Sequence, residues 1–169
     1  MAPLRIYVGG EVECEVAKFS GQLSSKGTNL PLGYAQLSEC WVFGEPEGTV
    51  AMNSCTIAFD LNGSGPPYEG ATSIVCSKAG DKIEVEGESC KASIYPKAGT
   101  TASVFETTGT GQYRGLWLTA GLTGIKFTVS QKSIWCPISN GTYEYGTLNG
   151  VFALSAPGAH SGVYLTGEG

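Results

Sequence analysis

TVAMNSCTIAFDL, residues 49–61, is the stretch that decides the fold. From its cysteine onward, apolar and polar side chains alternate with a period of two, which is typical of a half-buried β-strand. One face carries Cys55, Ile57, Phe59 and Leu61, and the other carries Thr56, Ala58 and Asp60. Because an α-helix would space its apolar residues three and four positions apart, this stretch predicts a strand with one side against a core.

The same alternation recurs along the chain. In VECEVAKF, residues 12–19, Val12, Cys14 and Val16 lie opposite Glu13 and Glu15, and residues 83–86 place two apolar side chains opposite two glutamates. Further strand candidates are residues 4–8, 72–76, 91–95, 103–107, 115–120, 125–130, 142–145, 150–155 and 163–166. No stretch of about ten residues carries an apolar stripe at helical spacing.

Turns rich in glycine and proline separate these candidates. We interpret residues 44–49 as a hairpin loop and residues 63–70 as an exposed loop rather than a linker. About a dozen short strands without helices predict an all-β fold, an antiparallel β-sandwich or a jelly-roll-like barrel. We expect a single β-sandwich domain over residues 1–169.

Composition and charge exclude several classes of protein. The chain is 41% hydrophobic and 15% charged, which differs from the composition of a disordered chain. A net charge of -5 repels phosphate backbones, so we expect no nucleic-acid partner. No apolar run approaches the roughly 18 residues of a membrane span. The opening MAPLRIYVGG is not a signal peptide, so we expect either a removed leader or release by another route, such as lysis with a virus particle.

The six cysteines, at positions 14, 40, 55, 76, 90 and 136, form no CxxC pair and accompany a single histidine. This favours disulfides over a metal site, with small buried reduced cysteines as the alternative. Six cysteines allow 15 connectivities, and spacing alone selects none of them. Our prediction is the sequential pairing of Cys14 with Cys40, Cys55 with Cys76, and Cys90 with Cys136.

Residues that could carry catalysis are scarce. A nucleophile–histidine arrangement would require His160, which lies in a turn of small residues and is more simply an exposed loop histidine. A glycosidase requires two carboxylates, and Glu84, Glu86 and Glu88 could form a row on one face, although solvated glutamates explain them equally well. We therefore predict a non-enzymatic protein with no catalytic residue, no bound metal and no cofactor.

Two short motifs carry little weight. DLNGSG, residues 60–65, starts like a calcium loop but has Ala71 where the final acid should lie, so it predicts an ordinary turn. NGS at 62–64 and NGT at 140–142 fit the N-glycosylation pattern, which also arises by chance.

Aromatic side chains are the remaining candidates for a binding site, because sugar-binding modules stack pyranose rings on exposed Trp and Tyr. The candidates are Trp41, Trp117, Trp135, Tyr143 and Tyr145. Trp117 lies between two leucines, so an apolar face of its strand must be covered by a second sheet, another subunit or a ligand. Tyr143 and Tyr145 share a face, and packing across strands is the simpler explanation for them.

An ordered set of segments covers nearly the whole chain: VECEVAKFSG (12–21), SECWVFG (38–44), MNSCTIAF (52–59), SIVC (73–76), KIEVEG (82–87), SCKASI (89–94), GIKFT (124–128) and NGTYEYG (140–146). In this set the chain resembles a group of uncharacterised secreted β-rich proteins that occur in many copies in some actinobacterial genomes. The resemblance implies a disulfide-bearing, all-β extracellular domain and no activity. Members usually begin with a secretion leader, and the acidic loops GEPEG and EGE are more charged here than in the group.

These observations favour a structural or interaction module on an extracellular surface, such as a cell envelope or a virion that it decorates. Its partner would be another protein or further copies of itself, bound through an apolar outer strand or a sheet edge. The alternative is a carbohydrate-binding module that uses exposed Trp and Tyr. Hydrolysis at Glu84 and Glu86 is a third hypothesis.

Overall fold

A computed structural model describes residues 4–23, 29–62, 68–99, 101–108, 115–155 and 163–168. In this part of the chain the secondary structure is entirely β, as the alternation predicts. The strands are β1 (Leu4–Tyr7), β2 (Glu11–Leu23), β3 (Asn29–Val42), β4 (Glu45–Ala51), β5 (Cys55–Asn62), β6 (Tyr68–Cys76), β7 (Ile83–Glu86), β8 (Cys90–Ile94), β9 (Thr101–Thr108), β10 (Gly115–Gln131), β11 (Gly141–Ser155) and β12 (Val163–Glu168).

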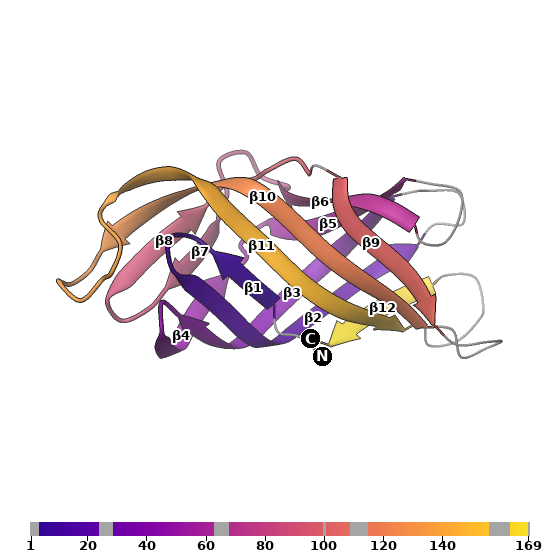
Figure 1. The fold of residues 1–169 in the computed structure, drawn as a ribbon, viewed down its shortest axis with the longest axis horizontal. Coiled ribbons are helices and arrows are strands. Elements are labelled where there is room, and N and C mark those ends of the chain that lie inside the picture. Colours follow the sequence, from indigo (N-terminus) through magenta and orange to yellow (C-terminus); the bar gives the residue numbers. More distant parts are fainter. Residues whose placement is uncertain are drawn as a thin grey trace.

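The sheet is antiparallel and closes on itself as an elongated barrel (Figure 1). The long strands β2, β3, β10 and β11 run through both halves. In one half, β1 joins β11 to β2, while β4, β7 and β8 join β3 to β10. In the other half, β12 joins β11 to β2, while β5, β6 and β9 join β3 to β10. Each half is therefore a complete ring of strands.

The expected two-sheet sandwich or jelly roll of about a dozen short strands is not confirmed. Candidates at 115–120 and 125–130 belong to one 17-residue strand, β10, and those at 142–145 and 150–155 belong to the 15-residue β11. The two glycines between the first two candidates do not form a turn, because Gly121 pairs with Asn149 in the strand and Gly124, with φ 67°, lies within a β-bulge of the β10–β11 pair. A bulge absorbs the extra residue and lets the strand continue.

Two strands lie where the sequence pattern predicted none. β3 was not among the candidates, and β4 covers most of the stretch 44–49 that we interpreted as a hairpin loop. The turn itself is only Phe43 and Gly44, both with positive φ (55° and 83°). The strand-breaking composition of GEPEGT is tolerated because β4 pairs irregularly with β3, with a register shift between Cys40 and Val42.

The core lies inside the barrel and follows the predicted faces. Ile57, Phe59, Ile83 and Val85 are at most 1% exposed. The expected inward series in β2 changes phase, because Val16 is half-buried and Ala17 is fully buried in its place. The fold thus confirms the period of two and shows that it is interrupted between Val16 and Ala17.

All six cysteines form disulfides in the predicted sequential order: Cys14–Cys40, Cys55–Cys76 and Cys90–Cys136. The first two link register partners on β2–β3 and β5–β6, with Cα–Cα distances of 4.0 and 3.8 Å. The third joins the start of β8 to the loop between β10 and β11. This bond orders a loop that the strand ladder alone does not hold. Within the described ranges, no helix has the length and apolar character required to cross a membrane.

Candidate binding surfaces at one end of the barrel

The loop between β10 and β11 presents two large apolar side chains to solvent. Ile134 is 89% exposed and the neighbouring Trp135 is 80% exposed. The two long strands carry this loop beyond the rest of the barrel, at the end formed by β1, β4, β7 and β8 (Figure 1). We call residues 132–140 the tip loop. An adjacent exposed Ile–Trp pair is uncommon on a solvated surface and marks a candidate interaction site.

The tip loop is held in one conformation by its base. The Ser89 carbonyl accepts hydrogen bonds from the amides of Lys132, at 2.8 Å, and Ser133, at 3.2 Å. The Gln131 amide donates to Asn140 Oδ1 at 2.6 Å, which closes the loop across its two ends. With the disulfide Cys90–Cys136, these bonds fix the backbone that carries the exposed pair.

The inner side of the tip loop packs against the barrel end. Cys136 and Ile138 are buried, and Ile138 lies against Gly9 and Gly10, where an added Cβ would crowd its side chain. A Cβ on Gly10 would also collide with the Phe43 ring. Glycines are therefore required where the β1–β2 turn meets the loop. Because the inward residues of the loop already satisfy its packing, Ile134 and Trp135 are not needed for the core.

Carboxylates surround the base of the tip loop. Lys132 Nζ is 2.8 Å from Glu86 Oε1, and this hydrogen bond and the ammonium charge lower the pKa of Glu86. Glu45 Oε2 accepts a hydrogen bond from the Ser89 amide at 3.1 Å, and hydrogen bonds from the Ser89 side chain and amide lower the pKa of Glu45. Glu88, in the same β7–β8 turn, is exposed. The base of the tip loop is therefore acidic, with three carboxylates against the one ammonium of Lys132.

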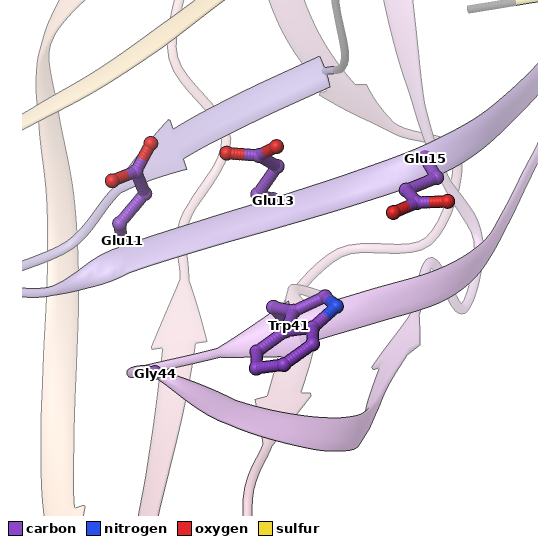
Figure 2. A pocket seen from close by; sticks show the side chains of 5 residues that line it. All are labelled: Glu11, Glu13, Glu15, Trp41 and Gly44. Carbon is purple, nitrogen blue, oxygen red and sulfur yellow. The ribbon is translucent and has the colours of Figure 1, made fainter.

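A second candidate surface lies on the barrel wall, in a hollow of about 350 Å³ lined by Glu11, Glu13, Glu15, Trp41 and Gly44 (Figure 2). Alternation along β2 places the three glutamates on its outer face, while Val12 and Cys14 point inward. Glu13 and Trp41 are register partners on β2 and β3, so Glu11 and Glu15 are the diagonal neighbours of the indole. Trp41 is 50% exposed in this position.

One residue of the chain already neutralises part of this hollow. Arg5, on the outer face of β1, is the register partner of Glu13. Its Nε lies 3.1 Å from Glu13 Oε2 and 3.3 Å from Glu11 Oε1. In Figure 2 the carboxylates of Glu11 and Glu13 point toward β1, whereas the Glu15 carboxylate points to the opposite side of β2. The Arg5 guanidinium is therefore paired with two of the three carboxylates.

The remaining aromatic candidates are placed differently. Tyr143 stacks on the buried Phe127 at 5.2 Å between ring centroids, as the packing interpretation predicts, and donates a hydrogen bond to the Ser139 carbonyl at 2.9 Å. Tyr145 meets Phe127 edge to face at 5.3 Å but is 51% exposed. The Trp117 side chain and all of His160 lie outside the described residues.

The glutamate row on β7 is bound by cations. Glu84 lies 3.6 Å from Lys82 and 3.5 Å from Lys91, and accepts a hydrogen bond from Ser93 Oγ at 3.0 Å. Glu86 is paired with Lys132, and Glu88 lies beyond the strand in the turn. Among the described residues, no group of three His, Cys, Asp or Glu side chains is placed to hold a metal ion.

The short motifs fall partly outside the described ranges. Residues 63–65 of DLNGSG and the last two residues of the sequon at 62–64 are not described. Asn140 of the second sequon is exposed, and its side chain closes the tip loop through Gln131. This asparagine therefore has a structural role that explains its presence without a glycan.

Sequence reasoning missed Ile134 and the three glutamates of β2 as site residues. The alternation of VECEV shows that Glu11, Glu13 and Glu15 share an outer face, but nothing local places Trp41 beside them. Comparison with protein-family models, with curated proteins and with solved structures gives no match. The resemblance to the secreted actinobacterial group stays a prediction.

Proposed function

We propose that the protein is a non-enzymatic interaction module that docks on a protein partner through Ile134 and Trp135. The observation that carries this proposal is the exposure of both side chains on a loop that is fixed by a disulfide and by backbone hydrogen bonds. A rigid apolar projection loses little conformational freedom on binding, and buried tryptophans are frequent hot spots of interfaces.

The acidic base of the tip loop defines the complementary chemistry of the partner. Glu45 and Glu88 flank the base of the tip loop beside the Glu86–Lys132 ion pair, and the chain carries a net charge of -5. The partner surface is therefore an apolar pocket with a rim of Lys and Arg, because matching potentials favour the encounter and repel wrong partners. The same charge disfavours anionic lipid surfaces and nucleic acid.

The proposed location is extracellular, either as a secreted protein or on the surface of a virion or cell envelope. Three disulfides are compatible with this location, since such bonds persist in oxidising compartments. The resemblance to secreted six-cysteine proteins supports the same location. In that setting the disulfides stabilise a barrel that acts as a rigid carrier for the tip loop.

The proposal is tested by placing a photo-reactive phenylalanine analogue at position 135 and irradiating the protein in its native source. A control analogue replaces Val75, which is also exposed but lies on β6, a strand of the other half of the barrel. We expect one protein to cross-link from position 135 and not from position 75. With that protein purified, Trp135→Ala and Ile134→Ser should each weaken binding by roughly tenfold or more.

Three outcomes decide the matter. Affinity for the purified partner that is unchanged in both variants overturns the role of the tip. Binding to zwitterionic lipid vesicles without any protein partner replaces the proposal by a membrane-docking function. Self-association that is lost in Trp135→Ala identifies a second copy of the chain as the partner, as expected for a surface assembly.

A carbohydrate-binding function is the second candidate, and Trp41 is the residue that favours it. Trp41 is half exposed beside carboxylate oxygens, which accept hydrogen bonds from sugar hydroxyls. Glycan-array binding that is lost in Trp41→Ala and retained in Trp135→Ala would support it. Loss in Trp135→Ala alone would assign any glycan contact to the tip instead.

A further inference from the structure

Independently of the tip loop, we propose that the hollow formed by Trp41 and the three glutamates of β2 is a binding site for an organic cation, an ammonium or a guanidinium group. The carboxylates alone do not define a site, because solvated glutamates on a strand face are common. Trp41 adds an aromatic surface to the carboxylates, since its indole lies half exposed at the same hollow. Aromatic faces attract cations, and tryptophan does so most strongly.

The local charge favours a cation over a neutral ligand. Glu11, Glu13 and Glu15 contribute three negative charges, and the positive charge of Arg5 is paired with two of them, Glu11 and Glu13. Glu15 is exposed, and no ion pair to it is found within the described ranges. Its carboxylate is on the side of β2 away from β1 (Figure 2). A cation placed over Trp41 would therefore meet a carboxylate that Arg5 does not neutralise.

The β-sheet register makes this arrangement rigid. Glu13 is opposite Trp41, and the disulfide partners Cys14 and Cys40 are the next pair along the same two strands. The disulfide prevents β2 and β3 from separating at this level, so the spacing of the indole and the carboxylates is set before a ligand arrives. Preorganisation of this kind reduces the cost of ordering groups on binding.

Arg5 shows that the hollow binds a guanidinium group, and it also limits the affinity of the hollow for an external cation. Its guanidinium nitrogen bridges Glu11 and Glu13 at 3.3 and 3.1 Å, as an external guanidinium could. An external cation must therefore compete with Arg5 for Glu11 but not for Glu15. Removal of Arg5 is expected to improve binding, which is a result that a merely structural or unfolded variant would not produce.

The probes are Nα-acetyl-arginine amide, Nα-acetyl-lysine amide and a glucosamine oligomer, with the N-acetylated oligomer as the neutral counterpart. The two amino-acid amides represent a cation from a peptide, and the glucosamine oligomer represents a cation from an amino sugar. The N-acetylated oligomer tests whether a neutral sugar stacks on Trp41. Binding is followed through the indole N–H resonance of Trp41 in NMR titrations of the full chain, with the resonance assigned from Trp41→Phe.

We expect the cationic probes to shift the Trp41 resonance and the neutral oligomer to leave it unchanged. Trp41→Ala, followed by backbone amide shifts on β2, should weaken binding by about fivefold or more. Glu15→Gln should weaken it by about threefold and Arg5→Gln should strengthen it by about threefold, with both effects reduced at high salt. Glu144→Gln, at an exposed glutamate of β11 that does not line the hollow, serves as the matched control and should change nothing.

Two results of these titrations would overturn the cation site. Equal shifts with the N-acetylated and free oligomers overturn the cation site and assign the hollow to neutral sugars. Affinity that is unchanged in both Glu15→Gln and Arg5→Gln overturns it as well, because no carboxylate is then involved. Since Ile134 and Trp135 take no part in these titrations, failure here leaves the docking proposal for the tip loop untouched, and the reverse also holds.

Discussion

Glu45 and Ser89 join three separate segments of the chain at one end of the barrel. The Ser89 amide donates a hydrogen bond to Glu45 Oε2 at 3.1 Å, while the Ser89 carbonyl accepts hydrogen bonds from the amides of Lys132 and Ser133. Ser89 is only 7% exposed, so these bonds are largely protected from water. Glu45 of β4 is thereby coupled, through one residue of the β7–β8 turn, to the loop that carries Ile134 and Trp135.

The first prediction concerns the pH dependence of stability. Hydrogen bonds from Ser89 place the pKa of Glu45 in the folded protein below its usual value of 4.5. A carboxyl with a lowered folded pKa stabilises the fold above the unfolded pKa, and this contribution disappears as the pH falls through the folded pKa. Glu45→Gln should therefore lower the urea midpoint at pH 7, and the difference from the parent protein should shrink as the pH falls below 4.5.

The matched control is Glu47→Gln, an exposed glutamate on the same strand. Its urea midpoint should follow that of the parent protein at every pH. A deficit of Glu45→Gln that stays constant between neutral and acidic pH would show that the charge of Glu45 does not stabilise the fold.

The second prediction concerns the disulfides. Cys90–Cys136 closes a segment with a sequence separation of 46, against 21 for Cys55–Cys76. Replacing both cysteines of a pair by alanine should cost about 4 kcal/mol for the first and about 3 kcal/mol for the second, on the chain-entropy account. Guanidinium unfolding of the two double variants measures the difference, and the opposite order of stability would contradict it.

Loss of Cys90–Cys136 should also have a local effect that loss of Cys55–Cys76 does not. The tip loop is tied to Cys90 through this bond, so limited proteolysis should cut near residues 132–140 first in the variant without it. The Cys55–Cys76 variant should lose resistance without selective cleavage at the tip.

The third prediction separates the outer from the inner side of the tip loop. Trp135→Ala removes a side chain that is 80% exposed, so the free energy of unfolding should change by no more than about 0.5 kcal/mol. Ile138→Ala removes a buried side chain that packs on Gly9 and Gly10, and should cost about 2–4 kcal/mol. Chemical denaturation of both variants provides the test. A Trp135→Ala cost close to that of Ile138→Ala would mean that the tryptophan is structural.

The fourth prediction concerns the close approach of Gly48 to Val42 across β3 and β4. A Cβ at position 48 would overlap the Val42 side chain, which is fully buried. Gly48→Ala should therefore destabilise the protein by about 1–3 kcal/mol through overpacking. In the Val42→Ala background the same substitution should cost less but keep part of its cost, because the clash with the Val42 methyl group is gone while the Cβ of residue 42 still lies 2.5 Å from the added carbon. Additive costs in the double variant would show that this remaining Cβ contact, and not the Val42 methyl groups, opposes the change.

Much of the strand content could be predicted from the sequence, because the two-residue period is a local property of the chain. Cys55, Ile57, Phe59, Ile83 and Val85 are buried as their alternation predicts. The β10 bulge at Gly124 could not be predicted, since a glycine in a turn and a glycine in a bulge look alike in the sequence. The same holds for β4, whose polar composition is typical of a loop.

By itself, the sequence determined the strand faces, the absence of helical periodicity and the acidic character of the chain. Only the tertiary structure decided that four long strands close the sheet into a barrel, that the tip loop turns Ile134 outward, and that Trp41 lies opposite Glu13. The physical reason is that side-chain alternation depends on neighbouring residues along the chain. Closure and register depend instead on hydrogen bonds between segments that are far apart in it.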